Sequence, residues 1–159
     1  MKLVGIFLGL LAFALIFVGI EYLYRLRASA MRSLAARWNL KYSDGHPRIW
    51  TAGRNAPLPH PTGFKMGCYP AHEVRRMWNV IDGQRNGNRV LIFDSTVGGP
   101  RGIYCSFVAV QANENLFVSD SPREKIAQCS GWIAIYRTRF LQVPWTLDVN
   151  RIEELLRRL

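Results

Sequence analysis

Residues 3–24 read LVGIFLGLLAFALIFVGIEYLY, and this stretch divides the chain into two unlike parts. Its first 18 residues, Leu3–Ile20, carry no charge. As a helix, the whole stretch would be about 33 Å long, which matches a bilayer hydrocarbon core of about 30 Å. The sequence therefore predicts a transmembrane helix, with an anchor over residues 1–27.

The residues that flank this stretch are typical of a membrane boundary. Lys2 precedes it on the N-terminal side. Tyr22 and Tyr24 stand where an aromatic belt belongs. Arg25 and Arg27 follow, with side chains long enough to extend to the lipid headgroups. We expect these five residues to form the flank of the membrane anchor.

A cleaved signal peptide is the alternative interpretation. Residues 28–30, Ala-Ser-Ala, have the small-x-small form of a cleavage site. However, the apolar run is longer than the usual core of about 7–15 residues in a signal peptide. Charged residues such as Glu21 and Arg25 also lie between the run and Ala30, where precursors are usually uncharged. We expect an uncleaved anchor, with cleavage at Ala30 as the open alternative.

Basic residues are concentrated after the apolar stretch rather than before it. Lys2 stands alone on one side, whereas five basic residues lie between positions 25 and 41. The positive-inside rule therefore places the N-terminus outside and the C-terminal domain in the cytoplasm. The odd number of cysteines, three, agrees with a reducing compartment.

Two glycines inside the expected span, Gly5 and Gly9, match a motif that lets membrane helices pack closely. The motif predicts a homodimer contact through this face of the helix. The plainer explanation is that glycine is common in membrane helices.

Residues 28–40 are expected to form a juxtamembrane amphipathic helix. Met31, Leu34, Ala35 and Trp38 recur at helical spacing, so the membrane helix is expected to continue into this stretch. Residues 41–159 are then expected to form a cytoplasmic α+β domain.

Alternating apolar residues and turn signals predict mostly antiparallel strands in this domain. The Asn86-Gly87-Asn88 triplet is typical of a hairpin turn. Residues 121–124, Ser-Pro-Arg-Glu, are typical of a helix start. The expected strands are Leu40–Ser43, Met77–Ile81, Arg89–Thr96, Ile103–Ala112, Leu116–Val118 and Trp132–Arg137.

The strand expected at Ile103–Ala112 is apolar on both faces, which is typical of a central strand. Val108 and Val110 belong to one face, whereas Cys105, Phe107 and Ala109 belong to the other.

The C-terminal residues predict a surface helix that packs against the sheet. Its apolar residues, at helical spacing, are Val149, Ile152, Leu155, Leu156 and Leu159. Asn150 and Glu153 resemble a capping box, and two Glu–Arg pairs, 153/157 and 154/158, follow in the favourable order. The expected fold is therefore α+β, with a small sheet domain closed by a C-terminal helix and compatible with a pleckstrin-homology-like barrel. A free protein-binding helix is the alternative for this segment.

Three segments together resemble small bacterial membrane-anchored proteins of unknown function. They are Asn79–Gly83 (NVIDG), Val90–Asp94 (VLIFD) and Gly131–Arg137 (GWIAIYR). The resemblance covers roughly Leu34–Leu159. It implies a bacterial inner membrane, and it assigns no active-site residue.

The Cys and His residues of the chain do not form a known catalytic or metal motif. His60, Cys68 and His72 are loosely spaced, and a zinc ion would need a fourth ligand such as His46 or Glu73. We therefore expect no metal and no cofactor.

A cysteine nucleophile is the second kind of site that the residues could form. Cys105 lies among apolar neighbours in an expected strand, where a thiol is normally inert. Cys129 has no local signature that identifies a base. We expect no catalytic residue, and the alternative is a membrane-anchored hydrolase that uses Cys129 or a metal at His60, Cys68 and His72.

The net charge of +10 restricts the class of partner. Arginine supplies most of the 21 basic residues, but no nucleic-acid recognition motif accompanies them. Each basic residue near an anionic leaflet contributes about 1 kcal/mol of attraction. We therefore expect a non-enzymatic binding or membrane-surface module whose partners are membrane lipid or a protein of unknown identity. We do not expect nucleic acid as a partner.

Overall fold

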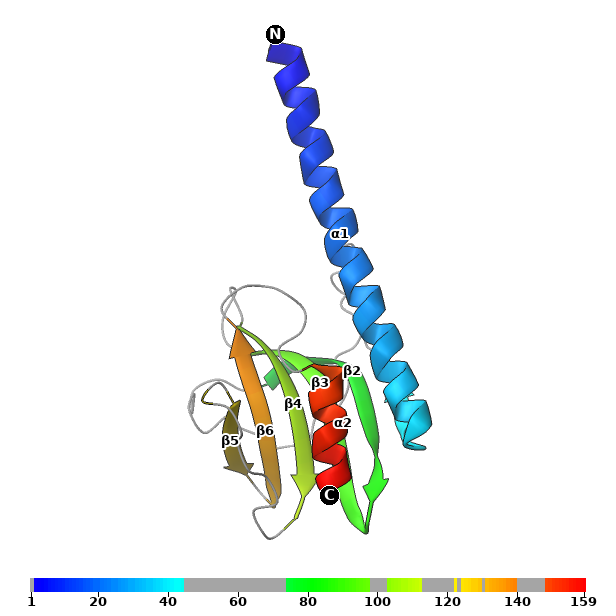
Figure 1. Cartoon of the computed structure of the whole chain (residues 1–159). Coiled ribbons are helices and arrows are strands. Elements are labelled where there is room, and N and C mark those ends of the chain that lie inside the picture. The colour runs from blue at the N-terminus through cyan, green and yellow to red at the C-terminus, as the bar shows by residue number, and fades with distance from the viewer. Residues whose placement is uncertain are drawn as a thin grey trace.

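The computed structural model describes residues 2–44, 74–97, 103–112, 122, 124–129, 131–139 and 148–159. These residues form two helices and six strands (Figure 1). In chain order the elements are α1 (Lys2–Arg37), β1 (Lys41–Ser43), β2 (Val74–Arg85), β3 (Asn88–Val97), β4 (Ile103–Gln111), β5 (Glu124–Cys129), β6 (Trp132–Arg139) and α2 (Val149–Arg158).

Helix α1 is continuous over 36 residues, about 54 Å. No glycine or proline occurs from Ile20 to Arg37, so the sequence contains no helix breaker there. The N-terminal part projects beyond the sheet, whereas the C-terminal part lies beside it (Figure 1). The expected continuation of the apolar helix into the amphipathic stretch is confirmed.

Helix α1 ends in a Schellman motif. Asn39 adopts a positive φ of 52°, a conformation that Asn tolerates better than most residues. Its amide donates to the Ala36 carbonyl at 3.2 Å, and the Leu40 amide donates to the Ala35 carbonyl at 2.8 Å. These bonds turn the chain directly into β1.

The strands form one antiparallel sheet with the order β1-β2-β3-β4-β6-β5. The expected hairpin is confirmed, with Asn86 and Gly87 at positive φ in its turn. In the described part of the chain the sheet is open, with β1 and β5 at its edges. Helix α2 lies on one face of the sheet rather than closing a barrel, and the pleckstrin-homology-like arrangement stays a prediction.

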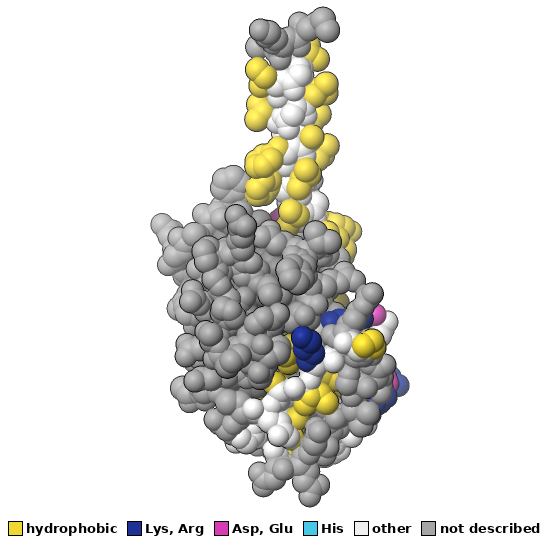
Figure 2. Space-filling model, turned by 90° about the vertical axis from the view of Figure 1, so that its left-hand side faces the viewer, with side chains coloured by type: hydrophobic (Ala, Val, Ile, Leu, Met, Phe, Trp, Pro, Cys, Tyr) yellow, Lys and Arg dark blue, Asp and Glu magenta, His cyan; other side chains and the backbone are white. Residues whose placement is uncertain are grey.

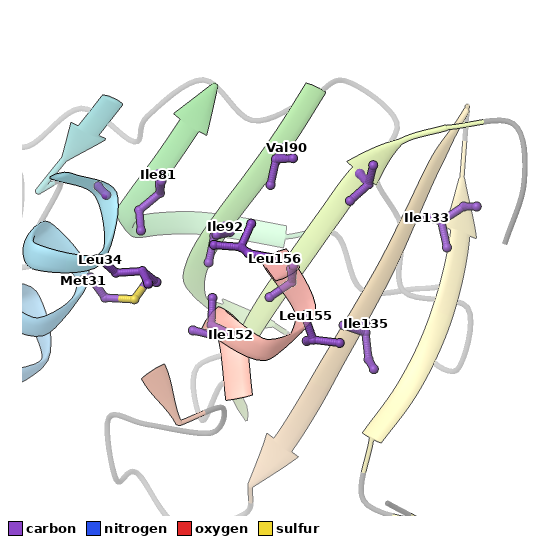
Figure 3. Packing of buried hydrophobic residues seen from close by; sticks show 13 residues of the cluster. Met31, Leu34, Ile81, Val90, Ile92, Ile133, Ile135, Ile152, Leu155 and Leu156 are labelled. Carbon is purple, nitrogen blue, oxygen red and sulfur yellow. The ribbon is translucent and has the colours of Figure 1, made fainter. Parts of the chain in front are cut away.

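Two clusters of buried side chains lie on the two faces of the sheet. The first joins α1 and α2 to one face, and Figure 3 shows Met31 and Leu34 of α1 pointing toward the sheet. The second contains Phe93, Phe107 and Tyr136 on the other face. Strand β4 contributes to both clusters with the alternation expected from the sequence, so its central position is confirmed.

Helix α2 packs its apolar stripe onto the sheet as expected, since Ile152, Leu155 and Leu156 are fully buried (Figure 3). Its cap differs from the prediction. Asp148 is the N-cap, with extended backbone and a carboxylate that accepts from the Asn150 amide at 3.4 Å. Asn150 is already inside the helix and cannot cap it.

Both predicted Glu–Arg pairs on the exposed side of α2 are present.

The helix start predicted at residues 121–124 is wrong. Residues from Glu124 onward form β5, which pairs with β6 through Ile126 opposite Ile135 and Ala127 opposite Ala134. A ladder between distant parts of the chain therefore outweighs the local Ser-Pro pattern. The strand expected at Leu116–Val118 lies outside the described residues.

Replacing the observed cap should destabilise the protein, whereas replacing the expected cap should not. Asp148→Ala removes the acceptor at the start of α2 and should lower the free energy of unfolding by about 1 kcal/mol. Asn150→Ala is the matched control and should leave it nearly unchanged. Thermal denaturation of the detergent-solubilised full chain measures both, and equal losses would contradict the assignment.

Candidate functional site

The projecting part of α1 is covered with exposed apolar side chains (Figure 2). Ten large apolar residues between Val4 and Val18 are 47–66% exposed. By length and composition, the segment Val4–Arg37 is a helix that could cross a membrane. A signal sequence near the N-terminus has the same properties, so α1 is a candidate membrane span or signal sequence.

The C-terminal part of α1 belongs to the core of the domain. Tyr24, Arg27, Ala28, Met31 and Leu34 are all buried. Their spacing of three and four residues places them on a single face of the helix. The same helix therefore presents apolar residues to the surroundings at one end and to the sheet at the other.

A buried ion pair joins α1 to the sheet. Arg27 donates from Nε to Oδ2 of Asp94 at 3.1 Å and from Nη2 to Oδ1 at 3.0 Å. The two side chains are only 3% and 2% exposed. This two-point geometry is the strongest form of an arginine–carboxylate contact, and burial protects it from screening.

Three further residues complete what we call the junction cluster: Tyr42, Asn79 and Ser106. Ser106 Oγ donates to Oδ1 of Asp94 at 2.6 Å, and Asn79 Nδ2 donates to Oδ2 at 2.9 Å. The Tyr42 hydroxyl donates to Oδ1 of Asn79 at 2.9 Å. Each carboxylate oxygen of Asp94 thus accepts two hydrogen bonds, and the cluster ties α1 to β1, β2, β3 and β4.

A bulge in β2 turns Asn79 toward Asp94. Met77 and Val80 both belong to the second apolar cluster, so the alternation of side chains is broken between them. The register of β2 on β3 shifts between Trp78 and Ile81, and Asn79 has a positive φ of 49°. The backbone amide of Asn79 donates to the Asp44 carbonyl at 2.8 Å, which extends the pairing with β1.

The junction cluster is suited to holding elements together rather than to chemistry. Asp94 is surrounded by four donor contacts, and Arg27 also lies 3.4 Å from Ser106 Oγ. Burial, and next the charge of Asp44, raise the pKa of the Tyr42 hydroxyl, which keeps this group protonated as a donor. The cluster therefore fixes the helix to the sheet.

Two more ion pairs attach α2. Arg37 of α1 contacts Glu153 at 2.7 Å. Arg151 makes two contacts with Glu124 of β5, at 2.9 and 2.8 Å, and Glu124 is the main cause of the raised pKa of Arg151. Helix α2 is thus attached both to α1 and to an edge strand.

The expected membrane flank is divided between two environments. Tyr22 and Arg25 are exposed, and Arg25 pairs with Glu21 at 3.1 Å. Tyr24 and Arg27 are instead buried in the domain, which corrects the expectation that Arg27 extends to headgroups. The helical period causes this division, because positions 24 and 27 lie on the packed face and positions 22 and 25 do not.

The sequence contained one indication of this arrangement. Arg27, Met31 and Leu34 follow the spacing i, i+4, i+7, so the arginine falls on the stripe that packs against the sheet. A charge on an apolar stripe indicates a buried partner, but the spacing alone does not identify Asp94. The side chain of Lys2, the remaining flank residue, is not among those described.

Of the other residues considered for chemistry, the structure describes only the side chain of Cys105. His46, His60, Cys68, His72 and Glu73 lie outside the described residues, as does the side chain of Cys129. Cys105 is a buried cysteine in the second apolar cluster. Within the described ranges, no group of three His, Cys, Asp or Glu side chains could hold a metal.

Comparison with known proteins found no matching family model, curated protein or solved structure.

Breaking the buried pair should be far more costly than breaking an exposed one. Asp94→Ala leaves Arg27 buried without its carboxylate and should lower the free energy of unfolding by about 3–5 kcal/mol. Asp82→Ala removes a similar two-point contact with Arg89 on the surface and should cost less than about 1 kcal/mol. Denaturation of the full chain in detergent compares the two.

The combined replacement of Arg27→Met and Asp94→Leu should be less destabilising than Asp94→Ala, because no unpaired charge remains. Part of the loss should persist, because Asn79 and Ser106 no longer have the carboxylate as an acceptor. If Asp94→Ala were as mild as Asp82→Ala, the cluster would not hold α1 to the sheet.

The Tyr42 hydroxyl should make stability depend on alkaline pH. Because its pKa is raised in the folded protein, its contribution is complete below the ordinary tyrosine value of about 10 and decreases as the pH rises above it. Tyr42→Phe should cost about 1 kcal/mol at pH 7, and this cost should shrink above pH 10. Chemical denaturation of both proteins from pH 7 to pH 11 measures the difference, and a constant difference would refute the claim.

Proposed function

We propose that this chain is a single-pass membrane protein, anchored by α1, whose sheet domain is a non-enzymatic binding or membrane-surface module. The observation that carries the proposal is that the exposed apolar half of α1 and its core-packed half belong to one unbroken helix. A large exposed apolar surface needs an apolar environment, and a bilayer supplies one of matching thickness.

The contacts of α1 with the sheet favour an anchor over a cleaved signal peptide. Cleavage after Ala30 would remove Tyr24, Arg27 and Ala28 from the core of the domain. It would also leave the Asp94 carboxylate buried without the guanidinium that neutralises it, a loss of about 3–5 kcal/mol. Because removal of Arg27 would destabilise the domain, we expect the mature protein to retain its N-terminal helix.

The orientation and the membrane are part of the proposal. Arg25, Arg32 and Arg37 are exposed on α1 beyond the apolar stretch, which favours a cytoplasmic domain and an external N-terminus. A bacterial inner membrane follows only from the resemblance noted in the sequence.

The proposed partners are anionic lipid headgroups or another protein. A binding role is supported by a domain whose described charged clusters are engaged in structural contacts rather than in a reactive site. Pairing of two copies through Gly5 and Gly9 stays a prediction, and a side-chain carbon added at either position would meet nothing within 4 Å of its own chain.

The anchor is tested on the full chain expressed in bacterial cells. The protein should remain in the membrane fraction after alkaline carbonate washing, and its intact mass should include residues 1–30. Phe13→Arg together with Ile16→Arg places two charges in the span and should release the protein, whereas Arg25→Ala should not. A mature protein that begins at residue 31 would refute the anchor.

The orientation has its own test. A cytoplasmic reporter fused to the C-terminus should be active, and a reporter that works only outside the cytoplasmic membrane should be silent. The reverse pattern would overturn the orientation and leave the anchor itself unaffected.

A further inference from the structure

We propose that α1 holds the sheet domain end-on to the bilayer as one rigid unit, so that the far end of the domain points away from the headgroups. This inference rests on the proposed function, since it requires α1 to cross a membrane. The far end is defined by Trp38, the β2–β3 turn at Asn86 and the last residue of the chain. Asn86 Nδ2 donates to the Leu159 carbonyl at 2.8 Å, which brings the turn and the end of α2 together.

The direction of α1 follows from contacts at two levels of the sheet. At one level Arg27 contacts Asp94, and at the other the Arg85 guanidinium lies 4.3 Å from the ring centre of Trp38. From residue 27 to residue 38 the helix rises about 17 Å. Arg85 pairs with Asn88, and β3 covers about 20 Å from there to Asp94.

The rise of α1 between these two contacts is nearly equal to the length of β3 between them. Helix α1 therefore runs along the strands rather than across them, as Figure 1 shows. The strands therefore continue the direction of the projecting apolar segment.

Contacts along the whole packed segment make the attachment rigid. The junction cluster holds the end near the apolar segment, and Arg37 with Glu153 holds the other end at 2.7 Å. Met31 and Leu34 are fully buried between them. No glycine or proline lies from Ile20 to Asp44, so this segment contains no residue that favours a hinge.

The length of this segment decides what the far end can reach. If the membrane boundary lies at Tyr24, Arg37 is about 20 Å beyond it along the helix. This is more than twice the Debye length of about 8 Å at physiological salt, so the potential of the headgroups is largely screened there. The basic residues of the far end include Arg37, Arg89 and Arg157, which are exposed and pair with Glu153 and Asp82. They are therefore held out of reach of the lipid that anchors their own chain.

Arg25, unlike the basic residues of the far end, lies close to the membrane boundary. It is 77% exposed and lies one residue beyond Tyr24, so it remains at the boundary. The rigid attachment thus separates a basic residue that can contact lipid from a basic far end that is presented to the aqueous side.

The test compares how close two spin labels on the full chain lie to the headgroups of lipid vesicles. Cys68→Ser, Cys105→Ala and Cys129→Ser provide a background without native thiols. Ser29→Cys places a label near the boundary, and Arg157→Cys places one at the far end, both at exposed positions. A nickel chelate attached to lipid headgroups broadens the signal of nearby labels.

The label at position 29 should be broadened several-fold more than the label at position 157. This ratio should be the same in neutral vesicles and in vesicles with anionic lipid. Broadening at position 157 that rises to the level of position 29 in anionic vesicles would overturn the end-on arrangement.

A hinge variant supplies the control. A flexible Gly-Ser-Gly-Ser insertion between Leu23 and Tyr24 should let the label at position 157 approach anionic vesicles but not neutral ones. No change in the insertion variant would mean that rigidity is not what keeps the far end away, and would also overturn the inference.

Flotation of every variant with the vesicles separates this inference from the proposed function. Protein that fails to float refutes the anchor, and the end-on arrangement with it. Protein that floats with its far end against the lipid refutes the end-on arrangement alone.

Discussion

The buried contact between Arg27 and Asp94 is the interaction on which the rest of the structure depends. An arginine and an aspartate that are both removed from water are stable only as a pair, and here the pair is completed by Asn79 and Ser106. Because Arg27 belongs to the long helix and its partners belong to three strands, the sheet domain includes part of that helix. The boundary expected after residue 27 therefore falls within the part of α1 that packs on the sheet, because the buried face of the helix already includes Tyr24.

One helix thus serves two environments. Its first half is exposed and apolar. Its second half carries a buried stripe that continues to Leu34 and Ala35. No glycine or proline separates the halves, and the Schellman motif at Asn39 ends the helix only after the packed face is complete. The same continuity supports the proposal that the helix is retained, and the proposed end-on arrangement rests on it.

Much of the fold follows from local patterns. The helix over the apolar run, the two apolar faces of β4 and the stripe of α2 follow from short-range periodicity. The Asn-Gly turn follows from two residues that tolerate positive φ. The failures need information from distant residues. Residues 124–129 form a strand because they pair with β6. Arg27 is buried in the domain, and not exposed at the membrane flank, because it pairs with Asp94, which lies 67 positions later in the sequence. The bulge that directs Asn79 to the same carboxylate has no local signature beyond a residue that tolerates positive φ.

The central claim is that the second half of α1 is part of the domain and not a linker. Native-state hydrogen exchange of the full chain in a membrane mimetic tests it directly. If this half of the helix belongs to the domain, the amides of residues 24–37 should exchange only through the same opening reaction as those of β3 and β4, with equal free energies of opening. Exchange of residues 24–37 through a separate opening of much lower free energy, while β3 and β4 remain protected, would contradict it.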